Sequence, residues 1–136
     1  MRIKLAMALV LAHVVSPAAS AADPYREPAV QSQREFATAY ASLAGMKVNV
    51  ARAYASSSRF PPTYVDAGVD GPVMGPYFAI ELGPEGVLKI MFNANADPAL
   101  AGTELTAVPT INESGDVIWH CLAPDIPKDV RPRACR

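Results

Sequence analysis

Two cysteines are the residues of this sequence whose chemistry is easiest to predict. Cys121 and Cys135 are the only cysteines in the chain of 136 residues. A structural zinc site has four ligands, and only His13 and His120 could join the two thiolates. In an exported chain a cysteine pair more often forms a disulfide. We therefore expect a bridge that orders residues 122–134, a proline-rich stretch with no predicted regular structure.

A second pattern, between residues 93 and 104, has the oxygen-bearing side chains of a calcium-binding loop. Positions 1, 3, 5 and 12 of such a loop are matched by Asn93, Asn95, Asp97 and Glu104. The match is poor, because Pro98 stands where the loop needs glycine and the first ligand is a neutral amide. An Asx turn, in which the side chain accepts a hydrogen bond from a nearby backbone amide, is the favoured prediction.

The histidines and serines do not form a recognisable catalytic motif. A Ser-His-Asp site could use His120, but no serine lies in a G-x-S-x-G nucleophile elbow. We instead expect His120 to lie on the outward face of a strand, opposite Trp119. The sequence predicts a protein that is not an enzyme and that has no cofactor and no small-molecule substrate.

Basic residues gather near the C-terminus and could form a partner surface. They are Lys128, Arg131, Arg133 and Arg136. Asp125 and Asp129 lie among them, and the formal net charge of the chain is −1. Nucleic-acid-binding surfaces carry a clear excess of positive charge, so nucleic-acid binding is not expected. A solvated loop is favoured over a surface for an acidic partner.

The clearest element of the scaffold that positions these residues is a helix over residues 32–58. Apolar residues recur there at helical spacing: Phe36, Tyr40, Leu43, Val50 and Tyr54, with Ala37, Ala44, Ala51 and Ala55 beside them. The polar side carries Arg34, Glu35, Asn49 and Arg52. Because Pro61 and Pro62 cannot continue a helix, we expect an amphipathic helix of about 25 residues, or ~40 Å, before them.

Beyond residue 76 the pattern changes from helical to alternating, which is typical of strands. Four strands are predicted, over residues 77–82, 87–93, 103–111 and 117–121. The first two should form a hairpin across the turn at residues 83–86. One sheet face, with Phe78, Ile80 and Leu82, should cover the helix. The expected fold class is α+β, one domain in which a long N-terminal helix packs on a four-stranded antiparallel sheet.

The connection between the helix and the sheet, residues 60–76, is long and has no periodic pattern. Loops of this length in a compact domain usually serve a function or are packed by their own side chains. We expect either a functional surface or a flap packed on the domain.

The first 21 residues predict a secretory signal peptide. Arg2 and Lys4 precede a short apolar run, and small residues end the segment at Ala21. The run is about half as long as the ~20 residues of a membrane span, so no stable span is expected after cleavage. We expect cleavage after Ala21, an extended lead-in over residues 22–31 and a folded domain over residues 32–136. The protein should be exported to the periplasm or the cell surface.

Two groups of residues carry a resemblance to a known family. The first, in and after the helix, is Ala44-Gly45-Met46-Lys47 with Val50, Tyr54 and Phe60-Pro61. The second and more specific group is Val117-Ile118-Trp119-His120-Cys121 with the closing Arg133-Ala134-Cys135-Arg136. Together they make residues 34–136 similar to the globular domain of a type IV pilin.

This resemblance implies a helix packed on a four-stranded antiparallel sheet, with a cysteine-bounded C-terminal loop at the surface. By position, Cys121 and Cys135 match the disulfide of the family, and Trp119 matches its last strand. Pilins are structural subunits of filaments used for adhesion, twitching motility and DNA uptake. The family has no catalytic residues to compare with this sequence.

The predicted mature start departs from the pilin pattern. Pilins begin with a long apolar helix, whereas residues 22–25, Ala-Asp-Pro-Tyr, are polar and contain proline. We expect a structural protein associated with pili and cell adhesion, with pilus components or other pilin-like subunits as partners. The alternative is a soluble periplasmic binding or pilus-assembly accessory module that has the pilin fold and does not polymerise.

Overall fold

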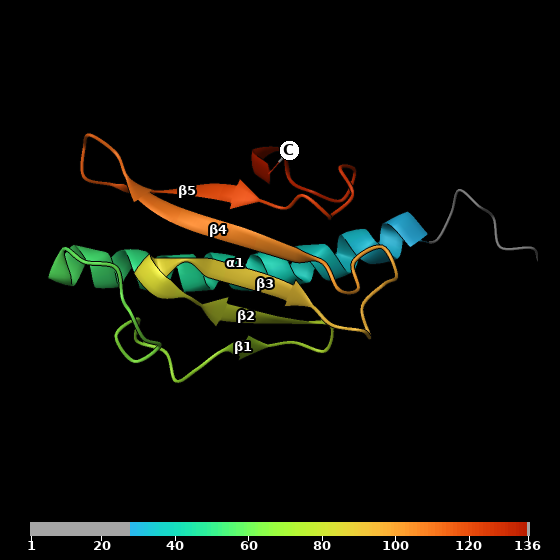
Figure 1. The fold of residues 1–136 in the computed structure, drawn as a ribbon, viewed down its shortest axis with the longest axis horizontal. Coiled ribbons are helices and arrows are strands. Elements are labelled where there is room, and N and C mark those ends of the chain that lie inside the picture. The colour runs from blue at the N-terminus through green and yellow to red at the C-terminus, as the bar shows by residue number, and fades with distance from the viewer. Residues whose placement is uncertain (1–27, 136) are drawn as a thin grey trace, which may run out of the picture.

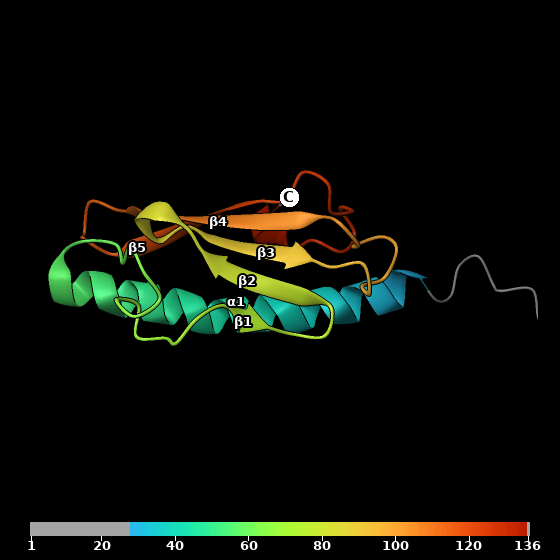
Figure 2. The same ribbon diagram turned by 60° about the horizontal axis from the view of Figure 1, so that its bottom comes forward.

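One long helix and an antiparallel sheet make up residues 28–135, which are the residues that the structure, a computed structural model, describes. In chain order the elements are the helix α1 (Pro28–Ser57), the strands β1 (Val73–Met74) and β2 (Phe78–Leu82), the 3-10 turn η1 (Pro84–Gly86), the strands β3 (Leu88–Phe92), β4 (Glu104–Ile111) and β5 (Val117–Leu122), and the 3-10 turn η2 (Arg133–Cys135). The sheet lies along one side of α1 (Figure 1, Figure 2). The predicted α+β class is confirmed, whereas the predicted signal peptide and residues 22–27 lie outside the described residues.

The helix α1 begins at Pro28, four residues before the predicted start at Ser32. The prediction of an extended lead-in is therefore wrong for residues 28–31. Proline is favourable in the first turn of a helix, because its φ is already helical and an N–H there would have no partner. At the other end, Ser58 has a φ of 53° and its amide donates to the Tyr54 carbonyl at 2.7 Å, which closes the last turn.

The buried face of α1 repeats every three or four residues. Its apolar members are Phe36, Ala39, Leu43, Met46 and Val50. Of the predicted face, Phe36, Leu43 and Val50 are buried, whereas Tyr40 and Tyr54 are half-buried at its margins. Three of the alanines predicted beside them are exposed: Ala37, Ala44 and Ala55. The buried stripe is narrow because a helix lying on a sheet buries only the side chains nearest to it.

The sheet has the order β1-β2-β3-β4-β5, and every neighbouring pair of strands is antiparallel. Its register aligns Ile80 with Ile90 across β2 and β3, and Ile90 with Leu105 across β3 and β4. These aligned side chains are fully buried. The ring of Phe36 in α1 stacks on that of Phe92 in β3, with centroids 6.1 Å apart. The core therefore lies between α1 and the central strands.

The prediction of four strands is wrong in number, because the sheet has one further short strand, β1. Its two residues, Val73 and Met74, pair with Ile80 and Ala79 of β2. Two residues are too few to form an alternating pattern, so no sequence signal marked this strand. The four predicted strands are confirmed, and their ends differ from the prediction by no more than one residue.

The connection from residue 60 to 76 packs on the domain. Ala67 is buried, and the Tyr64 hydroxyl accepts a hydrogen bond from the Leu82 amide at 3.1 Å. The Gly75 amide donates to the Phe78 carbonyl at 2.9 Å. Of the two predicted alternatives, these contacts favour the packed flap.

Gly86, in the turn between β2 and β3, is a position that other residues do not fit. Its φ is +75°, and a Cβ there would lie 3.1 Å from Phe60 Cβ and 3.1 Å from Val50 Cγ1. Gly115, in the turn between β4 and β5, has a φ of +84°, but its Cβ would meet nothing within 4 Å. The two glycines share the backbone requirement and differ in crowding.

We expect Gly86→Ala to lower the free energy of unfolding by about 2–4 kcal/mol, because crowding adds to the cost of a left-handed backbone. Gly115→Ala is the matched control and should lose only about 1–2 kcal/mol, the backbone cost. Urea denaturation followed by circular dichroism measures both values. Equal losses in the two variants would contradict the crowding at Gly86.

Candidate functional site

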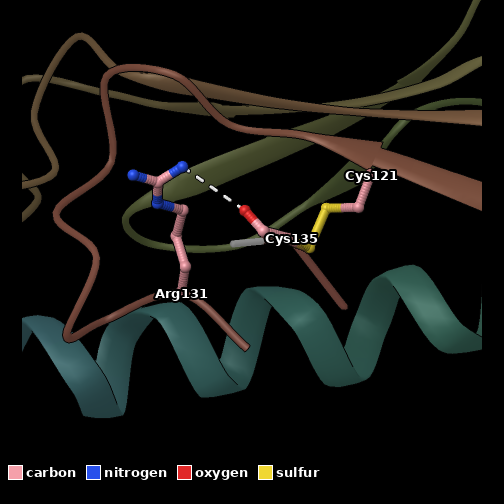
Figure 3. The surroundings of a disulfide bond; sticks show 3 residues. All are labelled: Cys121, Arg131 and Cys135. Atoms are coloured by element: carbon pink, nitrogen blue, oxygen red, sulfur yellow. Dashed lines mark hydrogen bonds between the residues drawn. A yellow bond between two sulfur atoms is a disulfide. The ribbon is translucent and has the colours of Figure 1, made fainter. Parts of the chain in front are cut away.

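The C-terminal segment that a disulfide closes is the candidate functional site. Cys121 lies in β5 and Cys135 in η2, and their side chains form a disulfide with the Cα atoms 4.8 Å apart (Figure 3). This Cα separation lies within the usual range for disulfides. The predicted bridge is confirmed, and the zinc alternative is wrong because both sulfur atoms are used in the bridge.

Apolar side chains also hold the loop between the two cysteines against the domain. Ala123, Ile126 and Val130 are buried. The Gln33 side chain of α1 donates from Nε2 to the Asp129 carbonyl at 3.4 Å. The loop is therefore ordered by packing as well as by the bridge. It also ends in the short 3-10 turn η2, where no regular structure was predicted.

The structure divides the predicted basic surface into exposed and anchored residues. Lys128 and Arg133 are exposed. Arg131 is half-buried and donates from Nη1 to the Cys135 carbonyl at 3.3 Å, the dashed line in Figure 3. Arg136 lies outside the described residues. Two of these cations thus face solvent, and a third helps to close the loop.

A further cation, Lys47 of α1, lies between two aromatic rings. Its Nζ is 5.3 Å from the centroid of the Tyr40 ring and 5.5 Å from the centroid of the Trp119 ring. Desolvation by burial lowers the pKa of Lys47, while the faces of the two rings attract its positive charge. Because Trp119 belongs to β5, this contact positions the edge strand over α1. The spacing of seven residues between Tyr40 and Lys47, which puts them on one helix face, was the signal available in the sequence.

Glu35 is a residue that the sequence analysis placed wrongly, on the polar side of the helix. It is buried, and its Oε1 accepts a hydrogen bond from Gln31 Nε2 at 2.7 Å. Its Oε2 accepts one from the Asp97 amide at 2.6 Å. Glu35 therefore joins the first part of α1 to the loop between β3 and β4. No local pattern distinguishes it from its exposed neighbour Arg34.

The residues of the predicted calcium loop form hydrogen bonds and an ion pair within the protein. Asn93 Oδ1 accepts the Asn95 amide at 2.9 Å, and Asp97 Oδ1 accepts the amide two residues further on, also at 2.9 Å. Glu104 lies in β4 with its carboxylate 3.5 Å from Lys89 Nζ. The favoured Asx turn is confirmed at Asn93. In the described part of the chain, no group of three or more His, Cys, Asp or Glu residues is placed to hold a metal ion.

His120 lies on the outer face of β5, as predicted. It is exposed, whereas the neighbouring Trp119 is half-buried on the inner face. The His120 Nε2 and Thr110 Oγ1 atoms are 2.9 Å apart, a hydrogen bond across β4 and β5. A strand histidine paired with a threonine needs no catalytic explanation.

A comparison with known protein families matches most of the described residues to one family. Residues 34–136, which include most of α1, the whole sheet and the disulfide, match the family described as Pilin (bacterial filament). The chain belongs to the pilin family. The predicted resemblance is confirmed over the range in which it was stated. No curated protein matches this pilin in a comparison of sequences. Between residues 28 and 135, no helix of this pilin has both the length and the apolar character needed to cross a membrane.

Replacing both Cys121 and Cys135 by alanine should lower the free energy of unfolding of this pilin by roughly 3 kcal/mol, because the unfolded chain loses its constraint. The buried apolar residues of the loop remain, so the variant should still fold. Urea denaturation measures the loss. Wild-type protein kept under reducing conditions is the matched control and should lose the same amount. A double variant as stable as the oxidised wild type would contradict the stabilising contribution of the bridge.

Proposed function

We propose that this pilin is a structural, non-catalytic protein that associates with pili and contributes to cell adhesion. The observation that carries the proposal is the match to the pilin family over residues 34–136. The disulfide between Cys121 and Cys135 supports it, because it closes the loop in which the resemblance to pilins is most specific. Other pilin subunits are the proposed partners.

The proposed partner surface is the exposed part of the disulfide-closed loop. Lys128 and Arg133 are exposed there, and so are Asp125 and Asp129. A surface that carries both signs of charge can pair with complementary charges on a neighbouring subunit and fix its orientation. Since packing and the bridge already order the loop, little conformational entropy is lost when it binds.

Export belongs to the same proposal. Residues 1–21 are proposed to direct the chain across the inner membrane as a signal peptide. The disulfide supports a destination in the periplasm or at the cell surface, because such bridges persist in oxidising compartments.

A second candidate is a periplasmic accessory module that has the pilin fold and does not polymerise. The polar and proline-bearing sequence of residues 22–27 favours it, because such residues are poorly suited to the apolar core of a filament. Both candidates use the same fold and the same disulfide-closed loop. They differ in where the protein is found.

Co-sedimentation with filaments sheared from the cell surface tests the first candidate. A pilus-associated protein should pellet with the filaments. Cells that assemble no filaments are the control, and the protein should be missing from their pellet. Recovery of all the protein in the osmotic-shock fraction, with none in the sheared filaments, would contradict pilus association and support the accessory module.

A further inference from the structure

A pocket at the C-terminal end of α1 is separate from the disulfide-closed loop. It has a volume of about 650 Å³, and its walls include the aromatic rings of Tyr54 and Phe60 and the prolines Pro62 and Pro109. The centroids of the two rings are 4.8 Å apart. The volume is within the range of ligand sites. Grooves lined by aromatic side chains bind extended, proline-containing peptides in several protein families.

Two opposite charges lie at this pocket. Arg59 and Glu85 line it and are exposed, and within the described residues neither forms an ion pair. The pocket is therefore suited to a peptide that carries charges of both signs and an aromatic ring.

The chain itself contains a segment with this chemistry, residues 22–27, Ala-Asp-Pro-Tyr-Arg-Glu, which carries two carboxylates, Asp23 and Glu27, one guanidinium and one aromatic ring. Asp23, Tyr25 and Arg26 lie within four consecutive residues. A short bound segment therefore offers a carboxylate, an aromatic ring and a guanidinium.

A second copy of the chain must supply this segment. The pocket is lined by residues where α1 ends and by Glu85 of η1, and in the sequence residues 22–27 precede the opposite end of the helix. The helix has 30 residues and is therefore about 45 Å long. Six extended residues span at most about 20 Å. With the predicted cleavage after Ala21, the segment cannot reach the pocket of its own chain.

We propose that residues 22–27 of one copy bind in the pocket of a second copy. Asp23 then pairs with Arg59, Arg26 pairs with Glu85, and the Tyr25 ring packs on Phe60. A contact of this kind joins two different surfaces, so it generates a ring where the rotation closes and an open row of subunits where it does not. It requires no pilus filament, so it can hold or fail independently of the proposed function.

Sedimentation velocity of the exported chain that begins at Ala22, measured over a range of concentrations, tests this self-association. We expect reversible association that Arg59→Glu weakens by about tenfold or more, because it places two carboxylates together. Asp23→Arg should weaken it equally, and combining the two changes should restore most of the association. Arg52→Glu is the matched control, since Arg52 is exposed on α1 outside this pocket, and it should change nothing. Thermal melting confirms that each variant is folded.

A synthetic peptide of residues 22–27, amidated at its C-terminus, tests directly whether this segment binds in the pocket. Titrated into isotope-labelled Asp23→Arg chain, it should shift the amide resonances of Phe60, Glu85 and Val108. A peptide with Tyr25→Ala should bind with an affinity at least about tenfold lower. A wild-type chain that stays monomeric at every concentration would overturn the proposal. So would a peptide that leaves these amides unshifted, and the pocket would then belong to another occupant, such as a segment of a different protein.

Discussion

The packing of one stripe of α1 on the inner face of the sheet is the interaction on which the rest of the structure depends. Leu43, Met46 and Val50 have almost no exposed surface, and they meet a sheet face on which Ile80 and Ile90 are equally buried. Full burial of a side chain of this size stabilises a protein by about 1.5–3 kcal/mol. The central strands contribute most of this contact, so the position of the helix is set by the middle of the sheet.

A single helix covers only one side of the sheet, so segments outside this interface need anchors of their own. The connection after α1 is held by the Tyr64 hydroxyl, and the loop after β3 is held by the Glu35 carboxylate on the Asp97 amide. The C-terminal loop is held by the bridge from Cys121 to Cys135 together with its buried apolar residues. The core thus fixes the position of the helix on the sheet. Individual hydrogen bonds and the disulfide fix the surface segments that a partner would contact.

The sequence predicts those parts of this structure whose signal is local. The helix and the four longer strands have patterns that extend over many residues, and the disulfide follows from a chain with two cysteines. The two-residue strand β1 has no such pattern, because it exists only through its pairing with β2. The burial of Glu35 depends on a partner 62 residues away. The difference between half-buried Arg131 and exposed Lys128 depends on the path of a proline-rich loop, which no periodicity encodes.

Native-state hydrogen exchange of the helix tests the central claim, that the stripe of α1 on the sheet holds the fold together. The amides of Leu43 and Met46 should open only when the whole protein unfolds, so their exchange free energies should equal the free energy of unfolding measured with denaturant. Amides in the first turns of α1, before the buried stripe, should exchange at lower free energies. Exchange of Leu43 and Met46 well below the global value would show that the helix opens while the sheet stays folded, and would contradict this account.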